Sequence, residues 1–143
     1  MEKQFIPYGQ ALELKELGFD EACFGLYAPP CKTVFLHHYG LLDAKEQHLA
    51  PLYQQAFRWF REKYNIDGFV RIEPLNEKYG FVIYNREKDN FKEFSTDYTK
   101  TEDAEFECLI KLIEIVKKTK KEFDKPFIDF AKQYVEQLKT KIK

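Results

Sequence analysis

Residues 48–64 of the chain read HLAPLYQQAFRWFREKY, the densest run of large apolar side chains at helical spacing in the sequence. At about 100° per residue, the aromatic residues fall on one broad face and the glutamines and arginines on the other. Pro51 suits the first turn of a helix, where a missing N–H costs nothing, and Asn65 suits its end, because it tolerates a left-handed backbone. The pattern predicts a core helix.

Aromatic and β-branched runs on either side of this helix predict two β-hairpins. Pro29 and Pro30 have no backbone N–H, so the segment between the first two strands cannot form regular sheet hydrogen bonds. Gly80 indicates a β-bulge or a close approach of another backbone segment in the second hairpin. Together the hairpins predict one four-stranded antiparallel sheet. The paired runs are residues 22–27 with 33–39 and residues 69–73 with 79–84.

Further helices are predicted at both ends of the chain. Residues 8–17 predict a short helix that Gly18 caps, and a stronger helix begins at Thr99 to Thr101 and continues to residue 118, with Cys108 on its buried side. Between these elements, the polar stretch 85–98 is interpreted as a loop. A last helix is predicted from Asp124, with Pro126 just inside it, and carries a long apolar stripe to Ile142.

The predicted fold class is α+β, with three to four helices mainly on one face of the sheet. At 143 residues, one domain spanning residues 1–143 is expected. The helix over residues 124–143 either packs on its own sheet or serves as an appended interaction or dimerisation element, since its stripe exceeds what a small sheet needs.

Composition limits the class of protein. The chain is 44% hydrophobic and 33% charged, which excludes a disordered chain, and no apolar run approaches the length of a membrane-spanning helix. The N-terminus lacks the layout of a signal peptide, and three cysteines are too few for a disulfide framework. A cytoplasmic protein without membrane association is expected.

Charge is distributed unevenly along the chain. Residues 1–110 hold 13 Lys and Arg against 19 Asp and Glu, whereas residues 111–143 hold 10 against 5. Such a basic end either binds an anionic partner or forms a solvated helix face. For nucleic acid, the candidate contacts are Lys117, Lys118, Lys120, Lys121 and Lys125.

Catalytic and cofactor motifs are not found. Ser95 is the only serine and has no neighbouring histidine, and the six glycines never cluster into a phosphate-binding loop. The residues that could bind metal or pair as nucleophile and base match no zinc spacing, and neighbouring histidines on a strand face opposite ways. No metal, cofactor or catalytic residue is predicted from this set: Cys23, Cys31, His37, His38 and His48.

Three segments together resemble a group of small, functionally uncharacterised proteins of gut bacteria and their phages or prophages. They are LKELGFDEACFGLY at 14–27, APLYQQAFRWFREKYNI at 50–66 and TEDAEFECLIKLIEIVKK at 101–118. The likeness covers most of residues 10–118 and leaves out the last 25 residues. It implies a mobile-element or accessory setting, and it transfers no activity and no catalytic residue.

Three hypotheses for function follow from these patterns. The leading one is a non-enzymatic accessory protein that binds another protein or itself, since aromatic residues are abundant and the terminal helix has an apolar stripe. The second is nucleic-acid binding through the five lysines. The third is a small-molecule or enzymatic site on the open face of the sheet, lined by Tyr27, His37, His38 and Tyr39.

Overall fold

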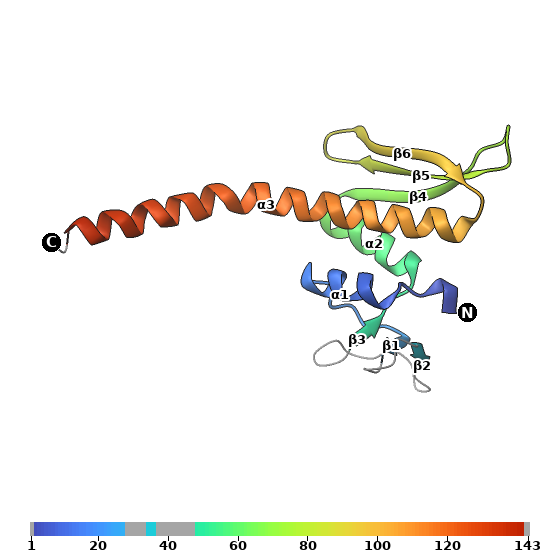
Figure 1. Cartoon of the computed structure of the whole chain (residues 1–143), viewed down its shortest axis with the longest axis horizontal. Coiled ribbons are helices and arrows are strands. Elements are labelled where there is room, and N and C mark those ends of the chain that lie inside the picture. Colours follow the sequence, from blue (N-terminus) through green and yellow to red (C-terminus); the bar gives the residue numbers. More distant parts are fainter. Residues whose placement is uncertain (1, 28–33, 37–47, 142–143) are drawn as a thin grey trace. The chain divides into compact units, whose positions relative to one another are not determined.

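The computed structural model describes residues 2–27, 34–36 and 48–141 of the chain, which form two compact units, Met1–Ile113 and Glu114–Lys143 (Figure 1). Helices and strands both contribute, which confirms the α+β class. In chain order the elements are η1 (Glu2–Gln4), α1 (Tyr8–Glu16), β1 (Gly25–Tyr27), β2 (Val34–Leu36), β3 (His48–Ala50), α2 (Tyr53–Tyr64), β4 (Ile66–Ile72), β5 (Tyr79–Asn85), β6 (Asn90–Tyr98) and α3 (Thr101–Lys141).

The strands form two separate three-stranded antiparallel sheets, in the orders β2-β1-β3 and β4-β5-β6. Both predicted hairpin pairings are confirmed, β1 with β2 and β4 with β5, but the prediction of one four-stranded sheet is wrong. Each predicted hairpin takes its own third strand instead, β3 beside β1 and β6 beside β5, and neither of these strands was predicted from the sequence. The two sheets lie apart with α2 between them (Figure 1).

Two strands lie where the sequence analysis placed other structure. Residues 48–50, quoted with the central helix, form β3, because Pro51 biases Ala50 toward an extended backbone and the helix begins only at Tyr53. Residues 90–98, interpreted as a loop, form β6 on the free edge of β5. The predicted first turn and the connection 40–47 lie outside the described residues.

The helix ends follow the sequence signals. Gly18 has a φ of 100° and its N–H donates to the carbonyl oxygen of Lys15 at 3.0 Å, while the N–H of Phe19 donates to Leu14 at 2.9 Å. These bonds close α1 with a Schellman motif, as expected for glycine at this position. At the end of α2, Asn65 adopts the left-handed conformation with a φ of 55°.

Helix α3 is continuous over 41 residues, so the prediction of a separate last helix from Asp124 is wrong. Pro126 lies inside the helix, where its missing N–H leaves one carbonyl oxygen without its helical partner. The segment between Thr119 and Asp124 contains no glycine or asparagine that could cap a helix end. Helix-forming residues on both sides therefore carry α3 past the proline.

The core of the unit Met1–Ile113 lies where α2 and the first turns of α3 meet the strands. A β-carbon at Gly68 of β4 would lie 2.8 Å from Leu112 and 2.9 Å from the Cys108 sulfur, so this glycine lets the strand lie directly on α3. Among the described residues, no helix is long and apolar enough to span a membrane. Side chains with no exposure include Ile6, Leu14, Phe60, Ile83, Leu109 and Leu112.

Candidate functional site

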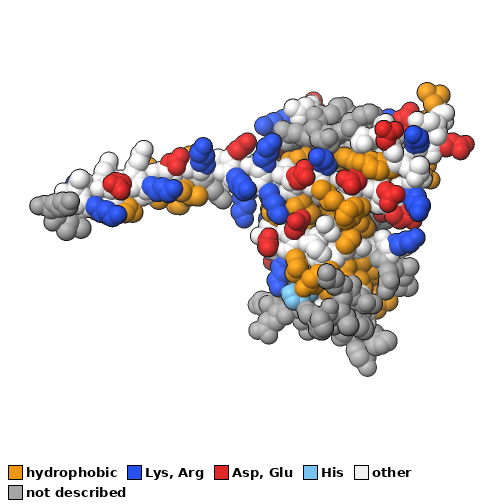
Figure 2. Space-filling model, viewed as in Figure 1, with side chains coloured by type: hydrophobic (Ala, Val, Ile, Leu, Met, Phe, Trp, Pro, Cys, Tyr) orange, Lys and Arg blue, Asp and Glu red, His pale blue; other side chains and the backbone are white. Residues whose placement is uncertain are grey.

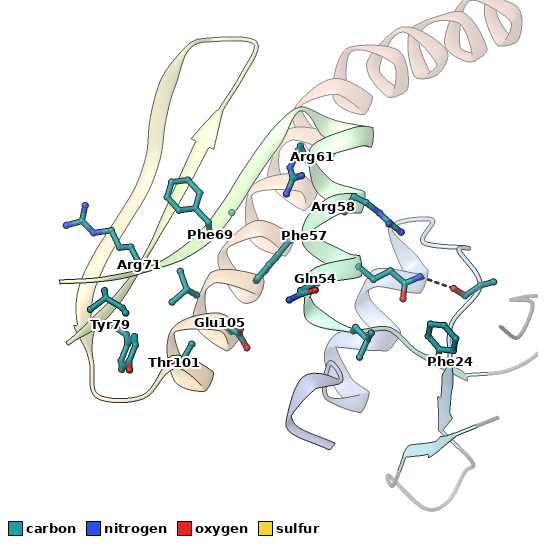
Figure 3. A pocket seen from close by; sticks show the side chains of 16 residues that line it. Phe24, Gln54, Phe57, Arg58, Arg61, Phe69, Arg71, Tyr79, Thr101 and Glu105 are labelled. Atoms are coloured by element: carbon teal, nitrogen blue, oxygen red, sulfur yellow. Dashed lines mark hydrogen bonds between the residues drawn. The ribbon is translucent and has the colours of Figure 1, made fainter. Parts of the chain in front are cut away.

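A groove of about 1100 Å³ runs along β4 between this strand and α2 (Figure 3). We name it the α2/β4 groove. Residues from α2, from the edge strand β4 and from the first turns of α3 line it, together with the segment before β1. The lining residues are Ala22, Phe24, Leu52, Gln54, Gln55, Phe57, Arg58, Arg61, Gly68, Phe69, Val70, Arg71, Ile72, Tyr79, Thr101 and Glu105.

One face of helix α2 packs in the core, and another face lines this groove. Trp59 and Phe60 are buried, and Trp59 makes edge-to-face contacts with its aromatic neighbours, as expected for a core helix. The opposite face presents Phe57, Arg58 and Arg61 to the groove, at spacings of one and three residues along the helix. Phe57, grouped with the core face from the sequence, is half-buried and points into the groove (Figure 3).

Within the described residues, one edge of β4 pairs with β5 and the outer edge pairs with no strand. Arg86 donates to the carbonyl oxygen of Asn65 at 2.9 Å and Glu73 donates to Lys78 at 2.7 Å, which sets the hydrogen-bonded positions of the β4–β5 ladder. Because these positions alternate, Gly68, Val70 and Ile72 direct their N–H and C=O groups away from β5. No backbone hydrogen bond among the described residues engages these groups, and all three residues line the groove.

Apolar side chains around the groove remain open to solvent. Phe24 is 51% exposed, Phe69 47% and Ile72 64%. Single exposed apolar residues are ordinary on a protein surface, but several gathered at one concavity mark a binding site. Because these residues flank an unpaired strand edge, the groove offers backbone hydrogen bonds and apolar contact together.

Three arginines and one carboxylate give the groove lining a positive balance. Arg61 forms an ion pair with Asp67 at 2.6 Å, Arg71 pairs with Glu73 at 2.6 Å, and Arg58 lies 3.6 Å from Glu21. These guanidinium groups keep 40% to 56% exposure of their side chains, so each retains donors toward solvent. The groove therefore suits a ligand with carboxylates.

Glu105 and Gln55 are the polar residues of the groove lining whose surroundings are resolved in most detail. Burial, with a smaller contribution from the charge of Glu102, raises the pKa of Glu105 above its usual range. Gln55 donates to the carbonyl oxygen of Ala22 at 2.8 Å, and its side-chain oxygen lies 3.5 Å from the Cys23 sulfur. The segment before β1 is thus fixed to α2, which makes the wall of the groove preformed.

Two buried cysteines, Cys23 and Cys108, lie among the described residues. Burial raises the pKa of the Cys23 and Cys108 thiols to about 12, with a smaller contribution from Glu21 or Glu105, so neither thiol is activated as a nucleophile. No group of three or more His, Cys, Asp or Glu that could hold a metal ion occurs in the described part of the chain. The groove combines cationic and apolar side chains.

Of the four residues predicted to line a small-molecule site, only Tyr27 lies within the described residues. Its side chain is 4% exposed, its hydroxyl donates to the carbonyl oxygen of Ile6, and its ring lies edge-on to Tyr8 at 5.3 Å. Tyr27 therefore packs in the core. His37, His38 and Tyr39, like Cys31 of the metal-binding set, lie outside the described residues, and His48 packs against Tyr8 at 5.7 Å.

The five lysines predicted to contact nucleic acid all lie on α3, within the unit Glu114–Lys143. Lys117 is half-buried and the other four are exposed. Spacings of three and four residues place them on one half of the helix surface. Apolar side chains follow on the same helix, and Figure 2 shows both kinds along it.

Sequence reasoning missed the groove although its two walls, α2 and β4, are consecutive in the chain, because the fold decides how the helix and the strand lie beside each other. The arginine face of α2 was visible in the pattern, but the free edge of β4 depends on which strands pair. One signal was available: Phe69, Val70 and Ile72 are apolar on both faces of a short strand, more than a half-exposed strand needs.

Comparison with known proteins yields no family model, no curated protein and no solved structure that matches the chain.

Proposed function

We propose that this chain is a non-enzymatic accessory protein that binds an extended segment of a partner protein in the α2/β4 groove. The partner segment adds to the edge of β4 as a further strand, the mode by which several peptide-binding domains hold their ligands. One observation carries the proposal: the outward N–H and C=O groups of Gly68, Val70 and Ile72 lie along the groove without a backbone partner in the part of the chain that the structure describes.

The walls of the groove define the chemistry of the partner segment. Main-chain hydrogen bonds supply affinity in strand addition, and alternate side chains of the added strand supply specificity. Phe57 and Phe69 favour apolar or β-branched side chains, and Arg58 and Arg61 favour carboxylates. The expected ligand is an extended segment of about five residues in which apolar and acidic residues alternate.

The accessory setting rests on the resemblance to small proteins of gut bacteria and their phages or prophages. That group has no known activity, so the mode of action is argued from the groove alone, which offers main-chain hydrogen bonds and apolar contact. The partner then belongs to the cell or phage that carries the gene, and its recognition segment is acidic and extended.

A random peptide library displayed on phage and selected on the full chain tests the proposal. Val70→Pro removes an outward N–H donor, and proline is tolerated on edge strands because no bond to β5 is lost. Val70→Ala is the matched control, since it shortens the side chain and keeps the N–H. Thermal unfolding followed by circular dichroism establishes that both variants fold.

We expect the selection on the wild type to enrich peptides with alternating apolar and acidic residues. Affinity for a selected peptide should fall roughly tenfold or more in Val70→Pro. The variant lacks the N–H that donates a hydrogen bond to the added strand, and the proline ring keeps the peptide backbone from approaching β4 closely. Val70→Ala should retain most of the affinity. A library that enriches no peptide, or peptides that bind Val70→Pro as tightly as wild type, would remove strand addition as the function.

A second candidate function, nucleic-acid binding, is favoured by the lysine cluster, which we define as Lys117, Lys118, Lys120, Lys121 and Lys125 on one half of α3. Each lysine that contacts a phosphate releases counterions, so affinity depends steeply on salt. Five such contacts predict a slope of about −4 to −5 for the logarithm of the association constant against that of salt concentration on duplex DNA.

Fluorescence anisotropy with labelled duplex DNA and with single-stranded RNA measures this candidate. Lys118→Glu with Lys121→Glu should abolish binding, while Lys132→Glu with Lys139→Glu, two lysines outside the cluster, changes net charge equally and should retain most of it. Absence of binding at low salt, or equal loss in both double variants, would rule out the lysine cluster as a specific nucleic-acid site.

A further inference from the structure

We infer that the C-terminal part of α3 binds the same segment of a second copy of this chain, as a short parallel two-stranded coiled coil. The inference does not depend on the proposed peptide binding, because the two surfaces share no residue. The segment lies in the unit Glu114–Lys143.

Large apolar side chains are exposed along this part of the helix. Phe127 is 75% exposed, Phe130 67% and Tyr134 56%, while Ile128, Val135 and Leu138 range from 42% to 48%. Lone apolar residues on a surface need no explanation, but a contiguous set over about three turns of one helix marks an interface. The question is which surface covers it.

Four apolar residues of this segment follow the spacing of a short heptad repeat, which favours a helix of the same kind as the partner. Ile128 and Val135 are seven residues apart, as are Ala131 and Leu138, and the two pairs interleave with alternating spacings of three and four residues. With the first pair at position a and the second at d, the seam has β-branched residues at a and Leu at one d. This composition favours two-stranded parallel coiled coils.

The residues beside the seam select the parallel direction. Lys132 and Lys139 occupy position e, and Phe127 and Tyr134 occupy position g. In a parallel pair, position g of one helix lies against position e of the other, so each aromatic ring meets a lysine stem and its ammonium group. In an antiparallel pair, e lies against e, and lysines would face lysines. Charge therefore disfavours the antiparallel arrangement.

The surface of the helix has a hollow that suits this packing. A depression of about 490 Å³ is lined by Ile128, Ala131 and Val135 on the seam, with Lys132, Glu136 and Lys139 at its side. Ala131 is the smallest of the seam residues, so a larger side chain of the second copy can enter beside it. Such insertion of one side chain into a hole formed by the facing helix is the packing unit of coiled coils.

The charge of the segment argues against nucleic acid or a lipid surface as the partner. Residues 127–141 contain three lysines, and Asp129 and Glu136 lie among them. Anionic membranes and nucleic acids attract helices with a strongly basic polar face. This part of α3 is nearly balanced, unlike the lysine cluster that precedes it, so a protein surface with apolar side chains is the better match.

Sedimentation equilibrium and light scattering of the full chain over a concentration series test the inference. The wild type should reach twice the 17.2-kDa mass of one chain. Val135→Lys places a charge in the seam and should leave a monomer at concentrations where the wild type is a dimer. Phe130→Lys is the matched control: it removes an apolar residue that is 67% exposed at position c, outside the seam, and should leave the dimer intact.

Cross-linking determines the direction of the helices. In a background with Cys31→Ser, which leaves only the buried Cys23 and Cys108, Val135→Cys should form a disulfide-linked homodimer upon mild oxidation, since a positions meet in a parallel pair. A mixture of Ala131→Cys and Val135→Cys chains should give little mixed cross-link. Predominant mixed cross-linking would overturn the parallel arrangement.

Three results would overturn the second copy as partner. One is a wild-type chain that stays monomeric over the whole series. Another is equal loss of the dimer in Val135→Lys and Phe130→Lys, which would mean that exposed apolar area alone drives association. The third is a monomeric wild type that cosediments with anionic lipid vesicles, together with a Val135→Lys variant that does not cosediment. Circular dichroism spectra establish that the variants remain helical.

Discussion

A β-carbon at Gly80 would lie 2.1 Å from the backbone carbonyl oxygen of Ser95, so β5 and β6 approach each other more closely here than any residue with a side chain allows. In the register between these strands, Tyr79 is opposite Tyr98 and Phe81 is opposite Ser95. Strand β6 therefore carries one extra residue across from Gly80. This bulge is the close approach that the glycine predicted in the sequence.

Replacing Gly80 by alanine should destabilise the protein by at least about 2 kcal/mol, because backbone atoms rather than a flexible side chain would have to move. Chemical denaturation followed by circular dichroism measures the free energy of unfolding. Gly9→Ala is the control: nothing lies within 4 Å of a β-carbon there, and the residue is in α1. That variant should gain about 0.5 kcal/mol. Equal stability of Gly80→Ala and wild type would contradict the close approach.

Strand β6 shows why the sequence concealed part of the fold. Two bulges interrupt its pairing with β5, one opposite Gly80 and one between the pairs Ile83 with Glu93 and Tyr84 with Phe91. Each extra residue reverses which face the following side chains occupy. The alternation by which a strand is recognised is lost, and a polar stretch with scattered aromatic residues is interpreted as a loop.

Elements with strong local signals were predictable. The amphipathic pattern of α2, the cap at Gly18 and the hairpin of β4 and β5 depend on residues close in sequence, and the structure confirms each of them. Sheet composition is different, because whether β2 can join β5 depends on which edges other strands have already taken. For the same reason the free edge of β4, on which the groove depends, has no local signature.

The buried thiols predict a loss of stability at alkaline pH. Burial raises the pKa of Cys23 and of Cys108 from 9.0 to about 12. Above pH 9 the unfolded chain releases these protons while the folded chain keeps them, so the unfolded state gains stability as pH rises. The free energy of unfolding should fall by up to about 1.4 kcal/mol per thiol for each pH unit above 9.

Urea denaturation at several pH values between 8 and about 11 measures this slope. A variant with Cys23→Ala and Cys108→Ala should show a shallower decline, whatever its stability at neutral pH. Some decline should persist, because burial also raises the pKa of Tyr53 and Tyr64. Parallel profiles for the variant and the wild type would show that the thiols do not contribute.

The ion pair between Arg61 and Asp67 predicts a measurable coupling at one end of the groove. Their atoms lie 2.6 Å apart, and Asp67 also pairs with Arg86 at 3.3 Å. A double-mutant cycle with Arg61→Gln and Asp67→Asn should give a coupling free energy of about 0.5–1 kcal/mol, since the groups are partly exposed. The coupling should shrink in 1 M salt, where the Debye length is about 3 Å. A salt-independent coupling would indicate packing rather than charge.

Amide hydrogen exchange along β4 provides the most direct prediction for the proposed peptide site. The N–H groups of Phe69 and Arg71 point to β5, whereas those of Gly68, Val70 and Ile72 point to the groove. The amides of Phe69 and Arg71 should exchange roughly tenfold more slowly than the other three, because only these two donate hydrogen bonds to β5. Nuclear magnetic resonance spectra recorded after transfer to heavy water resolve each amide.

Strand β5 is the internal control for this measurement. It has a partner on both edges, so neighbouring residues such as Val82 and Ile83 should both exchange slowly, without alternation. Addition of a peptide selected from the library should slow the amides of Gly68, Val70 and Ile72 and remove the alternation in β4, because an added strand accepts their hydrogen bonds. If these three amides are already as slow as that of Phe69 in the free protein, the edge of β4 is occupied, and no strand can be added there.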